Sequence, residues 1–118
     1  MYEQVVQRFA ERDELPLAEL TATALVNQGV TLGELGREDE ALAAYEQLVR
    51  RFSGRDELPL AEQTATALVN QGITLDQLGR GDEALAVFEQ VVRRFGERDE
   101  LPLAEQTDKA LVNQGNTL

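Results

Sequence analysis

An internal repeat is the feature that most constrains what this chain can form. The octet RDELPLAE occurs at residues 12–19, 55–62 and 98–105, so its copies start 43 residues apart. Residues 12–54 and 55–97 differ at ten positions, which leaves 33 of 43 identical, and the two units must share one backbone. The ends are partial copies, because residues 1–11 match 44–54 and residues 98–118 match 55–75. A period of this size is typical of arrays in which one small structural unit stacks on the next.

Within one unit, apolar and small residues recur at steps of three and four, which is the spacing of an α-helix. One such stripe consists of Ala18, Thr21, Leu25, Gly29 and Leu32, and a second of Ala41, Tyr45, Leu48 and Phe52. Between them, Gly36 can adopt the left-handed conformation that ends a helix. Asp39 and Glu40 suit the positively polarised start of the next helix. We therefore expect two antiparallel helices per unit, from about residue 16 to 35 and from about residue 39 to 52.

The predicted fold class is all-α: an α-solenoid of antiparallel helical hairpins, with one repeat array over residues 1–118. Its expected order is a partial repeat (second helix) at 1–11, full repeats at 12–54 and 55–97, and a partial repeat (first helix) at 98–118. Residues 1 and 118 do not look like natural boundaries, so we expect the chain to be a piece of a longer array.

Residues 24–45, with the letters ALVNQGVTLGELGREDEALAAY, resemble the tetratricopeptide repeat (TPR) family. Gly29 matches the small residue of the family's first helix and Ala41 that of the second, and a glycine facing an alanine would let the two helices approach closely. Tyr45 matches the aromatic residue one turn later. The chain departs from the family where Leu25, Gln28 and Ser53 stand for the usual Trp, Leu and Pro. The resemblance covers essentially the whole chain and implies a right-handed superhelix.

Each unit is nine residues longer than the usual repeat of 34. Placed in the first helix, the extra residues make that helix ~30 Å long against ~21 Å for the second. This arrangement resembles the longer-period repeats of the kinesin light chain type, in which a His-Pro-containing turn precedes an extended first helix. Leu-Pro-Leu-Ala holds the comparable place here. In the alternative interpretation, residues 55–63 form an ordered loop.

The composition argues against catalysis, nucleic acids and membranes. The chain has no histidine and no cysteine, so it lacks the commonest general base and metal ligand as well as any thiol. A net charge of −11 disfavours contacts with phosphate and favours basic partners. No apolar run approaches the ~18 residues of a membrane span. We expect a cytoplasmic protein that is not an enzyme and takes no cofactor or metal.

The candidate binding surface is the side of each first helix that lies opposite its apolar stripe. In the family that the chain resembles, this side lines a concave groove that receives peptides, and an asparagine there often holds the ligand backbone. The candidate partner-binding residues are Thr23, Asn27, Val30 and Glu34, then Thr66, Asn70, Ile73 and Gln77, and finally Lys109, Asn113 and Asn116. Alternatively, the amides bond to one another or to the neighbouring repeat. Because Lys109 is the one basic residue among them, a clamp for the carboxylate of a chaperone tail is disfavoured.

The partial repeats predict self-association, since together they are the two halves of one repeat. The expected oligomer is a dimer or a head-to-tail chain. The candidate self-association residues are Tyr2, Val5, Val6 and Phe9 at one end and Leu103, Leu111, Gly115 and Leu118 at the other. The alternative is a monomer, because Asp108 makes the last helix more polar than its counterparts. The sequence thus predicts a protein-interaction scaffold for a protein or peptide partner, with a structural, self-assembling array as the alternative.

Overall fold

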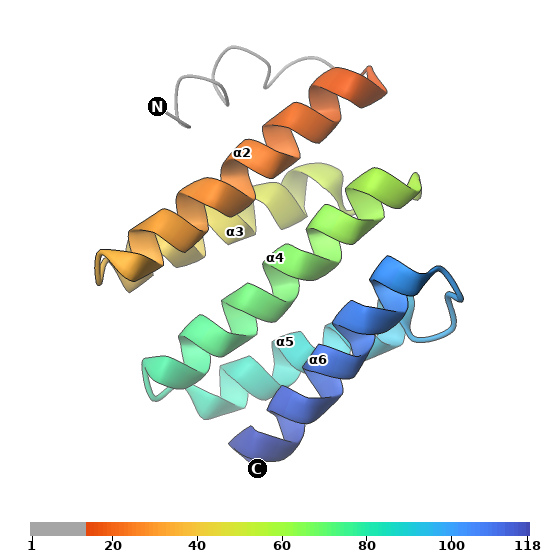
Figure 1. The fold of residues 1–118 in the computed structure, drawn as a ribbon. Helices are drawn as coiled ribbons and strands as arrows, with labels where there is room; N and C mark the ends of the chain where they lie inside the picture. Colours follow the sequence, from red (N-terminus) through yellow and green to blue (C-terminus); the bar gives the residue numbers. More distant parts are fainter. Residues whose placement is uncertain (1–13) are drawn as a thin grey trace.

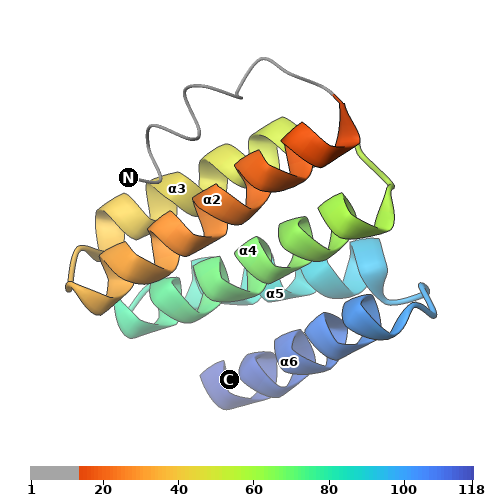
Figure 2. The same ribbon diagram turned by 45° about the horizontal axis from the view of Figure 1, so that its top comes forward.

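The computed structural model describes residues 14–118, which form α-helices joined by short turns. In order, the helices are α2 (Leu15–Glu34), α3 (Glu38–Phe52), α4 (Leu58–Gln77), α5 (Gly81–Phe95) and α6 (Leu101–Thr117). α2 and α3 form one antiparallel hairpin and α4 and α5 a second, while α6 follows without a partner of its own (Figure 2). The predicted all-α array of helical hairpins is therefore confirmed.

The nine surplus residues of each unit lie in its first helix. α4 runs through 20 residues from Leu58, so most of the segment 55–63 is helical, and the loop interpretation is wrong. Pro59 occupies the first turn, where the missing N–H costs no hydrogen bond. At 1.5 Å per residue, α2 and α4 are each ~30 Å long and α3 and α5 ~22 Å.

A glycine in the left-handed region closes each first helix. Gly36 and Gly79 have φ angles of 76° and 77°. After Gly79, the Arg80 N–H donates to the Leu75 carbonyl at 2.9 Å, and the Gly79 N–H donates to the Asp76 carbonyl at 3.0 Å. This pattern satisfies the last carbonyls of the helix and turns the chain into α5.

The helices form two layers, as Figure 1 shows. We call α2, α4 and α6 the inner layer, and α3 and α5 the outer layer. In the inner layer α2 packs closely on α4 and α4 on α6, whereas the backbones of the outer helices α3 and α5 lie farther apart. Because the inner helices are closer together than the outer ones, the array curves and the exposed side of the inner layer is concave. We call this side the inner face.

Aromatic rings from the outer layer pack directly on glycines of the inner layer. A Cβ built at Gly29 would lie 2.6 Å from Cζ of Tyr45, and one built at Gly72 would lie 2.7 Å from Cζ of Phe88. The side chain nearest to Gly29 is therefore the Tyr45 ring, which fills the space where a Cβ would lie. Both rings are buried, at 3% and 0% exposed.

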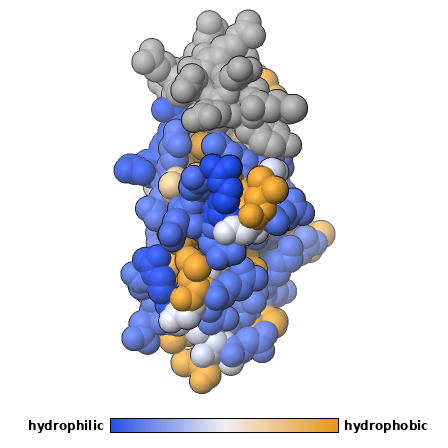
Figure 3. Space-filling view, turned by 90° about the vertical axis from the view of Figure 1, so that its left-hand side faces the viewer, coloured by the Kyte–Doolittle hydropathy of each residue, from blue (hydrophilic) through white to orange (hydrophobic). Residues whose placement is uncertain are grey.

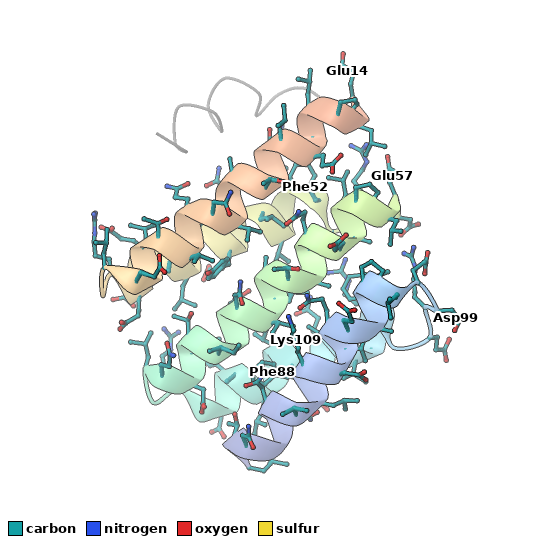
Figure 4. All side chains as sticks on the ribbon, viewed as in Figure 1. Glu14, Phe52, Glu57, Phe88, Asp99 and Lys109 are labelled. Carbon is teal, nitrogen blue, oxygen red and sulfur yellow. The ribbon has the colours of Figure 1, made fainter. Side chains whose placement is uncertain are left out.

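Arginines join one hairpin to the next. Arg94, near the end of α5, donates to the main-chain carbonyl of Ser53 at 2.8 Å, so it does more than complement the dipole of its own helix. In the turn before α6, Arg98 pairs with Glu100 at 2.6 Å, and this hydrogen bond holds the pKa of the Glu100 carboxyl below its usual value. Arg55 and Glu57 repeat the pair before α4, at 2.7 Å. Glu14, Glu57 and Asp99 mark the edge at which the inner helices begin (Figure 4).

Candidate functional site

The predicted partner-binding residues all retain some exposure to solvent. They lie on α2, α4 and α6, the three helices that stand side by side in the inner layer (Figure 1). Asn27, Val30, Glu34, Gln77, Lys109 and Asn116 are exposed, while Thr23, Thr66, Asn70, Ile73 and Asn113 are half-buried. Lys109 lies on the side of α6 that faces α4 (Figure 4). The array thus places residues that are 43 positions apart in sequence on neighbouring helices.

The charge of the inner layer is almost entirely negative. α2 and α4 contain no Lys or Arg, and Lys109 is the one basic residue of α6. Glu19, Glu62 and Glu105 hold the same repeat position, one helical turn before Thr23, Thr66 and Lys109. By the helical period they lie on the same side as those residues and form a row across the three helices. The arginines from Arg37 to Arg98 lie on the outer helices and in the turns.

Two of the three repeat asparagines make hydrogen bonds within the protein. The Asn70 side chain bonds to the phenol of Tyr45, so it links α4 to the preceding hairpin. Asn113 donates from Nδ2 to the Lys109 carbonyl at 2.8 Å, within α6. Beside them, Gln63 donates from Nε2 to Oγ1 of Thr23 at 3.4 Å, across two inner helices. Residue type alone did not reveal the link from Asn70 to Tyr45, because it joins helices of different repeats.

The buried Tyr45 phenol makes the stability of the protein depend on pH in the alkaline range. Burial raises the pKa of Tyr45 above its ordinary value of 10.0, and the hydrogen bond from Asn70 offsets part of that rise. The unfolded chain releases the phenolic proton at a lower pH than the folded protein does, so stability falls as the pH rises above about 10.

The variant Tyr45→Phe should lack this loss, and Phe88 shows that the repeat accepts phenylalanine at the position. From pH 8 to pH 11 we expect the free energy of unfolding of the parent protein to fall relative to that of the variant. Urea denaturation across that range measures it, and a difference that stays constant would show that the buried phenol does not titrate as described.

Several side chains of α6 are exposed at repeat positions that are buried in α4. Ala65, Leu68, Val69, Gly72 and Leu75 are all buried in α4, whereas their counterparts in α6 are all exposed. We call the exposed set the open face of α6; it consists of Asp108, Leu111, Val112, Gly115 and Leu118. Leu111 is 48% exposed and Val112 63%. Leu103, which was predicted to belong to the self-association surface, does not lie here: it is fully buried in the core with Phe88 and Val91.

The other half of the predicted self-association surface, Tyr2, Val5, Val6 and Phe9, lies outside the described residues. Seen from the edge at which α2 and α4 end, the surface is mostly hydrophilic, with apolar residues in separate patches (Figure 3).

A hollow of about 400 Å³ lies at the side of the first hairpin, and Leu32 and Gln28 of α2 and Ala44 of α3 are among its lining residues. In the second hairpin the counterpart of Leu32 is Leu75, which is 4% exposed and clusters with Leu42 of α3. The hollow therefore lies where, in the second hairpin, the preceding repeat covers the surface.

The residues from 14 to 118 contain no group of three His, Cys, Asp or Glu side chains placed to hold a metal ion. None of the helices in that region combines the length and apolar character that a transmembrane segment needs.

A family model of the tetratricopeptide repeat matches the chain at residues 2–56 and again at residues 26–99. The chain therefore belongs to the tetratricopeptide repeat family, whose members are generally modules for protein–protein interaction and are typically not catalytic. Searches of curated proteins and of solved structures found no match to the chain.

Proposed function

We propose that the protein is an interaction module whose inner face binds an extended, positively charged peptide segment of a partner protein. The observation that carries the proposal is the charge of the inner layer, in which two helices have no basic residue and a third has only Lys109. The row of Glu19, Glu62 and Glu105 offers one carboxylate per inner helix, and such a row attracts Lys or Arg side chains.

The polar groups beside this row suit a peptide backbone. A side-chain amide both donates and accepts hydrogen bonds, so it can pair with the C=O and N–H of an extended chain. Asn27 and Asn116 are exposed on the inner face, whereas Asn70 is held by Tyr45. In this proposal the ligand follows the concave face across α2, α4 and α6, and Asn70 positions the helices around it.

The test is the binding of peptides selected from a random peptide library with the full chain as bait. We expect selected peptides to be rich in Lys and Arg. The triple variant Glu19→Gln, Glu62→Gln, Glu105→Gln should bind them about tenfold more weakly, because each exposed ion pair contributes ~0.2–1 kcal/mol. Binding should also weaken as salt is added.

A matched control removes the same charge from outside the inner face, in the variant Glu46→Gln, Glu89→Gln, Glu97→Gln. All three of these residues are exposed. The control should bind like the parent protein in isothermal titration calorimetry. Equal losses in the two variants would show that net charge alone attracts the peptides and would contradict binding on the inner face.

A second candidate function is a self-assembling array, in which copies of the chain associate through their partial repeats as a dimer or a head-to-tail chain. The open face of α6 supports it, since Leu111 and Val112 are large apolar residues left exposed. Sedimentation velocity over a concentration series tests it, and a monomer at millimolar protein would rule it out.

We also propose two finer assignments from the sequence. The extended first helix of the repeat supports the kinesin light chain-like type of tetratricopeptide repeat. The absence of cysteine from the sequence agrees with a cytoplasmic location.

A further inference from the structure

Gly115 holds the same repeat position as Gly29 and Gly72, but no aromatic ring of the described residues packs on it. In α2 and α4, the space above Gly29 and Gly72 is filled by the rings of Tyr45 and Phe88. Above Gly115 of α6, a Cβ would meet no atom within 4 Å. The open face therefore contains a slot of the kind that receives an aromatic ring elsewhere in this chain.

The sequence contains a matching segment. Residues 2–9, Tyr-Glu-Gln-Val-Val-Gln-Arg-Phe, correspond to 45–52 of α3 and 88–95 of α5, and residues 3–6 are identical to 89–92. In α5 three of the four apolar residues of this motif, Phe88, Val91 and Phe95, are buried in the core cluster that includes α4, and Val92 is partly buried against it. The counterparts of the three buried residues in the segment are Tyr2, Val5 and Phe9.

We propose that the open face of α6 binds residues 2–9 of a second copy of the chain, with Tyr2 packed on Gly115. The contact would reproduce Tyr45 on Gly29 and Phe88 on Gly72, with Leu111 taking the place of Leu25 and Leu68. This inference rests on self-association, the second candidate function, and adds to it the residues that meet and the direction of assembly.

The segment must come from another molecule. The six steps from Phe9 to Leu15 span at most ~21 Å. Two helix spacings of 8–10 Å each, about 16–20 Å, separate α2 from α6, and a helix bound on the open face would lie one spacing farther, at about 24–30 Å from α2. A segment that leads into α2 cannot reach that face of its own chain. Because the two surfaces differ, the contact is heterologous and joins copies head to tail.

Charge opposes this assembly and gives it a distinctive salt response. Each copy carries a net charge of −11, whereas residues 2–9 contain one Glu and one Arg and are neutral as a segment. Salt screens the repulsion between copies and should therefore tighten association. Binding of a basic peptide on the inner face should respond in the opposite direction, so the two functions are separable in one salt series.

The decisive variant is Gly115→Ala. The added methyl group meets open space in the free protein and favours the helix, so α6 should fold at least as well as before. In the assembly the same methyl group would collide with the incoming ring. We expect the dissociation constant from sedimentation velocity to rise by about five- to 150-fold, the range for a methyl group forced into a packed contact. Gly33→Ala, at another open glycine of an inner helix, is the matched control and should leave association unchanged.

Variants of the partner residue complete the test. Tyr2→Ala should weaken association as Gly115→Ala does, whereas Tyr2→Phe should preserve it, since Phe88 fits the same kind of slot. Asp108→Ala should tighten association, because Asp108 stands where α2 and α4 bury Ala22 and Ala65, and burying an unpaired carboxylate is costly.

Mixing reveals the direction of the contact. Tyr2→Ala keeps an intact slot and Gly115→Ala keeps an intact ring, so two proteins that are each monomeric should form a 1:1 complex together. A mixture that stays monomeric overturns the proposal. The proposal is also overturned if Tyr2→Ala and Gly115→Ala each associate as well as the parent protein. In that case self-association itself would still stand. A monomeric parent protein would refute both, and it would leave peptide binding on the inner face untouched.

Discussion

Replacing Phe88 with alanine is expected to lower the free energy of unfolding by about 3–5 kcal/mol, the usual cost of deleting a buried aromatic side chain. Phe88 is completely buried, belongs to the core cluster shared by α4, α5 and α6, and packs on Gly72. Its loss would leave a cavity between the two layers at the centre of the array. Urea denaturation followed by circular dichroism measures the change.

The control for this variant is Phe88→Tyr, which adopts the residue of the first hairpin at the same repeat position. It should lose much less stability than Phe88→Ala, because Asn113 stands in α6 where Asn70 bonds Tyr45 from α4. If both variants lost the same amount, the packing of the ring would not be the source of the stability.

Gly72→Ala is expected to destabilise the protein by about 1–3 kcal/mol, the range for a methyl group forced into a packed core. The new Cβ would lie 2.7 Å from Cζ of Phe88, and the ring is held on all sides by the core. The same substitution at the matching position of α6, Gly115→Ala, should instead stabilise the monomer by up to about 1 kcal/mol, because nothing opposes the better helix former.

Thermal and urea denaturation show whether each glycine variant is more or less stable than the parent protein. They are measured at a concentration where the protein is monomeric. A loss of stability in both would mean that the slot at Gly115 is already filled in the monomer. A gain in both would mean that the ring of Phe88 can move away from Gly72.

The helices could be predicted from the sequence to within about one residue. The first helix was expected over residues 16–35 and lies at Leu15–Glu34, and the second was expected over 39–52 and lies at Glu38–Phe52. The reason is that local signals determine these bounds: proline in the first turn, glycine with a positive φ after the last, and apolar residues at helical spacing.

Contacts between repeats could not be predicted in the same way. Leu103 and Leu111 lie on one apolar stripe, yet Leu103 is buried against α5 and Leu111 is 48% exposed. Periodicity shows that both are apolar positions, but it does not show which neighbour covers each. The pairing of Asn70 with Tyr45 and of Arg94 with Ser53 joins residues 25 and 41 positions apart, and such pairings depend on how the hairpins stack.

The hydrogen bond from Arg94 to the Ser53 carbonyl, which joins the two hairpins, bears on how the number of repeats can change in evolution. The guanidinium group bonds a main-chain carbonyl, which is present whatever the side chain, and residue 53 is serine in one unit while residue 96 is glycine in the next. A tandem duplication or deletion of one 43-residue unit would therefore recreate this main-chain hydrogen bond without any compensating mutation, and only the additional bond to the Ser53 hydroxyl, at 3.3 Å, would be lost where glycine stands. Protein length can change here in whole units, and selection can adjust the reach of the array by copy number alone.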